Sequence, residues 1–180
     1  MKFEIIGPFE VAFENIIKQD NIKQLRALIG LGTSEAALLG APGCYIFAIK
    51  PSGSRRYIPW YVGKSEKQSI FLEATNKSHL QIYNEILDGK TKAKVGLYFV
   101  PAITQNKKPR KISKAKLGDA RIAFLEEWLI ATALKANKDL WNIKSTTMLR
   151  NLSVRGLLNP TPGDMNKAAG SLKKCLCINN

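Results

Sequence analysis

The sequence predicts an α+β domain in which a small central antiparallel sheet of about three strands is flanked by helices. Two strand-like segments, 43–50 and 60–64, are separated by a short stretch of turn-forming residues. A third strand-like segment, 94–102, follows a helical stretch, and the most apolar helical segment of the chain, 117–137, comes after it. The order strand, strand, helix, strand, helix (ββαβα) is typical of α+β architecture.

The residues before this core predict further elements. The segment "FEIIGPFEVAFE" looks extended, "NIKQLRALIG" predicts a helix that ends at Gly30, and "TSEAALLG" has the Thr/Ser start and Gly stop of a short helix. We expect residues 1–40 to form an N-terminal extension packed on a core of residues 41–142. The basic tail, 143–180, predicts a C-terminal extension, and the whole chain, 1–180, is interpreted as a single domain.

The connections within the core and the tail are also predicted from local patterns. The helical stretch from Glu66 to Leu87 has an expected interruption near Asn76. The segment "QNKKPRKISKAK", 105–116, lacks hydrophobic periodicity and predicts a basic loop. In the tail, "NPTPG" predicts irregular structure before a last helix.

The charge of the chain indicates the class of its partner. The sequence has 180 residues and a formal net charge of +14, with a pI of about 9.8. A field of this sign favours a polyanion, with nucleic acid ahead of a membrane surface. No apolar run approaches the ~20 residues of a membrane span, and the N-terminus does not have the pattern of a signal peptide. We expect a cytoplasmic protein that binds nucleic acid, in the first place double-stranded DNA.

Other residue counts exclude several kinds of site. The three cysteines, Cys44, Cys175 and Cys177, are an odd number without a disulfide pattern, which fits a reducing compartment. The single histidine, His79, argues against structural zinc, which needs about four Cys or His ligands. No G-x-x-x-x-G-K-[ST] motif is present, so we expect no nucleotide cofactor.

The two strands 43–50 and 60–64 carry matched tyrosines and glycines. If they form a hairpin centred on Gly53, Tyr45 lies directly opposite Tyr61 on one face of the sheet. One interpretation is an aromatic pair in the core. The other is a phosphate-binding surface made of two phenols, the neighbouring cation Lys64, and backbone left open by Gly43 and Gly63.

These residues also carry a resemblance to a known family. Gly43-Cys44-Tyr45, a spacer and Tyr61-Val62-Gly63, followed by a helix, a strand and a helix with a glutamate, resemble the signature of the GIY-YIG nucleases over residues 41–142. The resemblance implies a metal-dependent endonuclease that hydrolyses DNA phosphodiester bonds with Mg²⁺ (or Mn²⁺). It implies catalytic roles for Tyr45 and Tyr61, a metal-binding role for Glu126, and a match of Asn142 to the asparagine that closes the motif set.

The sequence departs from that signature in one respect. The family has an arginine in the helix after the second tripeptide, whereas no arginine occurs between Lys64 and Leu87. Lys77 and His79 are the candidates for the vacant catalytic role, although a lysine does not reproduce the planar fork of an arginine. A domain that binds nucleic acid without cutting it is therefore an alternative function, and an ordinary structural histidine is an alternative for His79.

Glu126 can be assigned a position without the family. At ~100° per residue, the polar stripe of the helix 117–137 is formed by Arg121, Thr132 and Lys135, and Glu126 lies nearly opposite it. A carboxylate that faces the protein body needs a cation, which is either a metal ion or a buried lysine.

The positions of lysines and arginines in the sequence indicate where nucleic acid would bind. The residues expected to contact phosphates are Lys64, Lys107, Lys108, Arg110 and Lys111. A third hypothesis is a basic structural protein whose tyrosines belong to the core. The sequence leaves the oligomeric state open.

Overall fold

The computed structural model describes residues 1–30, 33–90, 92–112, 118–142, 147 and 167–175. The chain divides into two compact units, Met1–Trp141 and Asn142–Asn180, and each is considered by itself. In the second unit, the described residues include helix α7 (Lys167–Cys175). The sheet and the remaining helices described below belong to the first unit. No helix in the described part of the chain is both long and apolar enough to cross a membrane.

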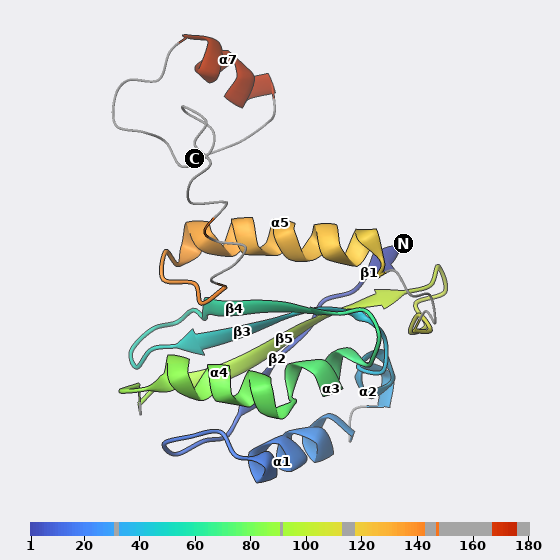
Figure 1. Cartoon of the computed structure of the whole chain (residues 1–180), viewed down its shortest axis with the longest axis vertical. Helices are drawn as coiled ribbons and strands as arrows, with labels where there is room; N and C mark the ends of the chain where they lie inside the picture. The colour runs from blue at the N-terminus through green and yellow to red at the C-terminus, as the bar shows by residue number, and fades with distance from the viewer. Residues whose placement is uncertain (31–32, 91, 113–117, 143–146, 148–166, 176–180) are drawn as a thin grey trace. The chain divides into compact units, whose positions relative to one another are not determined.

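The first unit contains an antiparallel sheet of five strands. The strands are β1 (Lys2–Phe3), β2 (Ile6–Val11), β3 (Gly43–Lys50), β4 (Ile58–Ser65) and β5 (Lys94–Ile103). Strand β3 lies between β4 and β5, and β5 also pairs with β1 and β2, so β4 forms one edge of the sheet. The expected α+β architecture, a small antiparallel sheet flanked by helices, is confirmed (Figure 1).

The sheet has more strands than the three or so expected from the sequence. The additional strands, β1 and β2, come from the N-terminal segment, which was expected only to pack on the core. They pair with β5 along the side that β3 leaves free, where unpaired N–H and C=O groups would otherwise be open to another chain. The division of a single domain, 1–180, into a core of 41–142 and two extensions stays a prediction.

The helices lie where the sequence indicated. They are α1 (Gln19–Gly30), α2 (Thr33–Leu38), α3 (Ile70–Ala74), α4 (Lys77–Leu87) and α5 (Ala120–Ala136). The expected interruption separates α3 from α4. Asn76 begins α4 as its N-cap, because its side-chain oxygen accepts a hydrogen bond from the main-chain N–H of His79.

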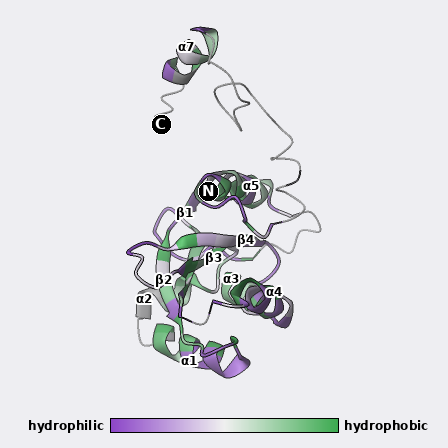
Figure 2. Cartoon of the chain, turned by 90° about the vertical axis from the view of Figure 1, so that its left-hand side faces the viewer, coloured by the Kyte–Doolittle hydropathy of each residue, from purple (hydrophilic) through white to green (hydrophobic). Residues whose placement is uncertain are grey.

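Helices cover both faces of the sheet. Helix α5 lies on one face, and α1, α3 and α4 lie on the other (Figure 1). The larger core, on the α3–α4 face, includes the buried side chains of Tyr45, Phe47 and Tyr83. The smaller core, on the α5 face, is built around Cys44 and Ile122. Apolar and polar residues both occur along the helices and strands of these layers (Figure 2).

The register of the hairpin differs from the one expected. Tyr45 pairs with Gly63 and Tyr61 pairs with Phe47, so the two tyrosines are diagonal neighbours rather than directly opposed. The predicted register was therefore wrong by two residues. Near the turn, the pairing changes by one residue at a β-bulge between Phe47 and Ala48, which the symmetric hairpin did not anticipate. Because a shift of two preserves the face, both tyrosines still lie on one side of the sheet.

Candidate active site

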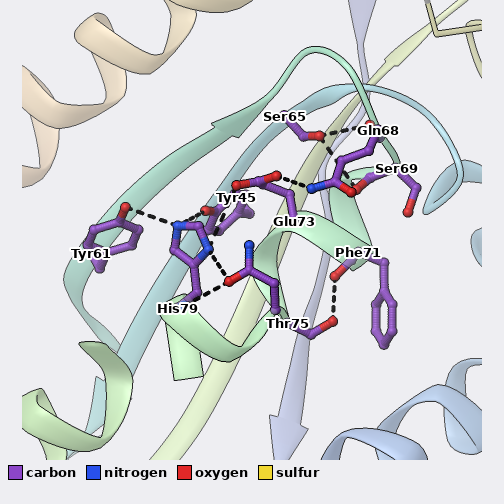
Figure 3. Close-up of polar contacts among 10 residues, drawn as sticks. Tyr45, Tyr61, Ser65, Gln68, Ser69, Phe71, Glu73, Thr75 and His79 are labelled. Carbon is purple, nitrogen blue, oxygen red and sulfur yellow. Dashed lines mark hydrogen bonds and ion pairs between the residues drawn. The ribbon is translucent and has the colours of Figure 1, made fainter. Parts of the chain in front are cut away.

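Two tyrosine hydroxyls converge on one nitrogen of the single histidine. The Tyr45 hydroxyl lies 2.8 Å from His79 Nε2, and the Tyr61 hydroxyl lies 3.3 Å from the same atom. The tyrosines come from β3 and β4, and His79 comes from the first turn of α4 (Figure 3). We call these three residues the Tyr–His cluster. Their shared location agrees with the sequence interpretation in which the two phenols converge.

The glycines of the two matched tripeptides are required by different close contacts. A Cβ atom on Gly63 would lie 2.3 Å from the hydroxyl of Tyr45, because the phenol ring crosses directly over this residue of β4. A Cβ on Gly43 would lie 2.3 Å from the main-chain oxygen of Val100 in β5. Gly63 thus lets the Tyr45 hydroxyl extend across the edge strand, whereas Gly43 allows two strands to approach. Both glycines therefore leave space for atoms of the chain itself and not, as the sequence interpretation had it, for a ligand.

Asn76 fixes the orientation and the protonation of the imidazole. Its Oδ1 accepts the main-chain N–H of His79 at 2.9 Å and lies 3.0 Å from His79 Nδ1. Because Oδ1 can only accept, Nδ1 must carry the proton, which leaves a lone pair on Nε2 for a phenol hydroxyl. The Glu73 carboxylate lies 3.8 Å from Nδ1, on the same side of the ring. The histidine is therefore a neutral acceptor toward the tyrosines.

Burial keeps the cluster uncharged. It lowers the pKa of His79 below its usual value, against the opposing effect of the Glu73 carboxylate. Burial also raises the pKa of Tyr61, and the nearby Glu126 charge adds to that effect. The pKa of Tyr45, which is fully buried, is raised far above its ordinary range, mainly by burial. At neutral pH, the basic atom of the cluster is thus His79 Nε2 rather than a phenolate oxygen.

Glu126 forms an ion pair on the other face of β4. Its Oε2 lies 3.0 Å from Lys64 Nζ, and the Glu126 side chain is 19% exposed while that of Lys64 is 33% exposed. Partial burial alone would lower the pKa of Lys64, but the hydrogen bond and charge of Glu126 raise it. The expectation that Glu126 faces the protein and meets a cation is borne out, and in the structure that cation is Lys64.

A divalent cation would have one carboxylate available here. No group of three or more His, Cys, Asp or Glu side chains suited to a metal occurs among the described residues. Magnesium, however, is commonly held by one or two carboxylates together with waters and substrate phosphates. After burial, repulsion from the Glu126 charge contributes to the raised pKa of Tyr61, and it is the smallest contribution to the raised pKa of Tyr45. A cation here would have the Glu126 carboxylate as its protein ligand, in competition with Lys64, and would need waters and substrate phosphates to complete its coordination.

Two further residues proposed from the sequence are Lys77 and Asn142. Lys77 is exposed at the start of α4 and lines a separate hollow with Ile17 and Gln19. Asn142 is the first residue of the second unit. The structure therefore does not bring Lys77 to the Tyr–His cluster, because Lys77 lies on the α1 side of its helix. The match of Asn142 to the family asparagine stays a prediction.

The predicted phosphate contacts of the basic loop occupy a turn after β5. Lys107 N–H donates to the main-chain oxygen of Thr104 at 3.1 Å, and Lys107 has a positive φ of 55°. Lys107, Lys108 and Lys111 are exposed, whereas Arg110 is half-buried. Their role in binding nucleic acid stays a prediction.

Two asparagines were missed by sequence reasoning. Asn76 was noticed only as a break between helices, although its place three residues before His79 is an N-cap signal. Asn137, at the end of α5, donates from its side chain to the main-chain oxygen of Pro59 at 2.9 Å. It ties α5 to the edge strand, over a separation in sequence that no local pattern reveals.

Comparisons of the chain with protein-family models, with curated proteins and with solved structures found no match.

Proposed function

We propose that the chain is a metal-dependent endonuclease that hydrolyses phosphodiester bonds in DNA. The observation that carries this proposal is the convergence of two phenols on His79 Nε2, with Nδ1 oriented by Asn76. A neutral imidazole that accepts hydrogen bonds from hydroxyls is suited to take up a proton at neutral pH. The basic character of the chain, with its net charge of +14, supports a polyanionic substrate.

The proposed proton path begins at Tyr61. This side chain is half-buried, whereas Tyr45 is fully buried, so Tyr61 is the phenol that can meet water. As a water molecule attacks phosphorus, its proton passes to the Tyr61 oxygen while the Tyr61 proton passes to His79 Nε2. The ester P–O bond to the leaving strand breaks at the same time, and the departing oxygen takes a proton from solvent water. His79 then returns its proton to solvent. This relay forms the new P–O bond without a free phenolate, which the raised pKa of Tyr61 would make costly. Tyr45, whose hydroxyl lies 2.8 Å from the same Nε2, holds the imidazole in place.

Glu126 is the residue that would hold Mg²⁺ or Mn²⁺. When bound, the cation would stabilise negative charge on a non-bridging phosphate oxygen. Lys64 is paired with this carboxylate and supplies a second positive charge at the same edge of the sheet. The GIY-YIG resemblance of the sequence agrees with these assignments.

Plasmid cleavage by matched glutamate variants tests the proposal. We expect purified protein to nick supercoiled plasmid with Mg²⁺ and to stop in EDTA. Glu126→Gln keeps the shape of the side chain but removes the charge that a hard cation requires, so cleavage should be lost. Glu127→Gln alters an exposed neighbour on the same helix and should cut normally. Full cleavage by Glu126→Gln would contradict the cation role.

A second candidate function is nucleic-acid binding without cleavage. The Lys64–Glu126 ion pair favours it, because the carboxylate already has a positive partner at 3.0 Å. Wild-type protein that retards DNA in a gel but never nicks it with Mg²⁺ or Mn²⁺ would support this function over the nuclease.

A further inference from the structure

A bulge in β4 turns Trp60 to the α3–α4 face of the sheet, the face that also carries the Tyr–His cluster. In the register of the hairpin, Phe47 pairs with Tyr61 and Ala48 pairs with Pro59, so Trp60 is the additional residue between them. Strict alternation would place Trp60 and Tyr61 on opposite faces of the sheet. Instead, both aromatic rings pack against the same core cluster on the α3–α4 face. A bulge that re-aims a side chain is a common feature next to active sites.

Trp60 lines a surface hollow with a volume of about 400 Å³. Ile49, Pro51 and Ile58 supply its apolar wall on the hairpin. Lys90 and Lys92, in the connection between α4 and β5, also line the hollow. None of the described lining residues is acidic, so the hollow combines a flat apolar surface with two ammonium groups.

The position of Lys90 is fixed from two sides. Its Nζ lies 4.7 Å from the centroid of the Trp60 ring and donates to the main-chain oxygen of Ile86 at 2.6 Å. The charge is therefore held over one face of the Trp60 ring rather than free in solvent. Glu10, the carboxylate at this end of the sheet, is bound by the Tyr57 hydroxyl at 2.9 Å and by Lys94 at 3.1 Å.

We propose that this hollow binds a nucleobase of the substrate strand, with its neighbouring phosphates on Lys90 and Lys92. A base is flat and apolar on its faces and carries anionic phosphates on either side, which matches the indole and the two lysines. Stacking of this kind, together with a basic rim, is the usual means of holding single-stranded nucleic acid. This proposal rests on the proposed nuclease function. The site would hold the DNA strand at Trp60, the residue next to Tyr61 in β4.

Trp60 fluorescence in EDTA tests the site without cleavage. The chain has three tryptophans, so Trp128→Phe with Trp141→Phe leaves Trp60 as the only emitter. We expect a short oligothymidylate to quench its emission on binding. An abasic oligomer with the same phosphates should bind without quenching. Equal quenching by both oligomers would overturn base stacking, since charge alone would then explain the signal.

Affinity measurements on single variants provide the second readout. Trp60→Leu keeps an apolar side chain against the core but removes the aromatic face, and should weaken oligothymidylate binding about tenfold. Trp128→Leu removes an exposed tryptophan of α5 and should leave the affinity unchanged. Lys92→Gln should weaken both oligomers alike and reduce the salt dependence. Melting curves verify that each variant is folded, and Trp60→Phe should retain most of the affinity.

Two outcomes separate this site from the proposed function. If the protein cuts DNA while Trp60 is neither quenched nor needed for affinity, the base site is wrong and the nuclease stands. If Trp60 is quenched by the oligothymidylate but no metal supports cleavage, the base site stands and the nuclease is wrong.

Discussion

The two faces of the edge strand β4 carry opposite kinds of chemistry. On the α3–α4 face, Tyr45, Tyr61 and His79 form hydrogen bonds among neutral groups. On the α5 face, Lys64 and Glu126 form an ion pair at 3.0 Å. Both faces are built from neighbouring residues of the same strands, since successive side chains of a strand point to opposite sides.

Solvent access explains the difference. Burial shifts the pKa values of the tyrosines upward and that of His79 downward, so each group stays in its uncharged form. The ion pair keeps one third of the Lys64 side chain exposed, and its charges remain hydrated in part. The comparison teaches that one edge strand can carry a neutral proton acceptor on one face and an ion pair on the other, each with the solvent access that its charge state needs.

The largest expected effect is on catalysis by the neutral face. His79→Gln keeps a polar side chain but removes the basic nitrogen, so we expect plasmid cleavage to fall by about 10²- to 10⁴-fold. DNA binding, measured by gel retardation, should be unchanged because His79 carries no charge at neutral pH. Ser78→Ala changes an exposed neighbour on α4 and serves as the control. Normal cleavage by His79→Gln would leave the cluster as a purely structural feature.

Gly63→Ala should disturb the position of Tyr45 in the Tyr–His cluster. The new methyl group would lie 2.3 Å from the Tyr45 hydroxyl, so the phenol or the strand must move. We expect a loss of about 1–3 kcal/mol in the free energy of unfolding, measured with urea. Gly30→Ala is the matched control, because no heavy atom lies within 4 Å of its Cβ. Two equally stable variants would show that Tyr45 does not need the space above Gly63.

Lowering the pH should reduce the stability of the folded protein, because His79 becomes protonated. The folded pKa of His79 is lowered below its ordinary value of about 6.5, so the unfolded chain binds the proton more readily. The stability that neutral His79 contributes is complete above pH ~6.5 and is lost as the pH falls toward the folded pKa. Relative to His79→Gln, the wild type should therefore lose melting temperature below that pH. If the melting temperatures of the two proteins changed with pH in the same way, the prediction of a buried neutral histidine would be contradicted.

Tyr83→Phe should have the smallest effect, and it sharpens the comparison within the neutral face. The Tyr83 hydroxyl is buried and has no hydrogen-bond partner among the described residues, while its ring stacks on Phe47 at 4.1 Å. Removing the oxygen should leave the free energy of unfolding unchanged or raise it by up to about 1 kcal/mol. Tyr45→Phe, which leaves His79 Nε2 without its nearer donor, should instead lower it by about 1–3 kcal/mol. A marked loss on Tyr83→Phe would reveal a partner for that hydroxyl.

Much of the secondary structure could be predicted from local patterns. The helix that ends at Gly30, the break near Asn76 and the three hairpin and core strands all depend on turn residues and apolar periodicity within short windows. The number of strands could not be predicted in this way. Strands β1 and β2 join the sheet through hydrogen bonds to β5, about 90 residues away along the chain, and a single strand does not encode its partner.

The sequence by itself determined which chemical groups are available to the candidate site: two phenols next to glycines, one imidazole and an inward glutamate on the last core helix. Only the tertiary structure decided how they meet. The register differs by two residues from the symmetric one, so Tyr45 crosses Gly63 instead of facing Tyr61. Asn76 set the proton on His79, Lys64 became the partner of Glu126, and Lys77 was turned away. The physical reason is that side-chain type and period are local properties, whereas register, hydrogen-bond partners and burial depend on contacts between segments distant in the chain.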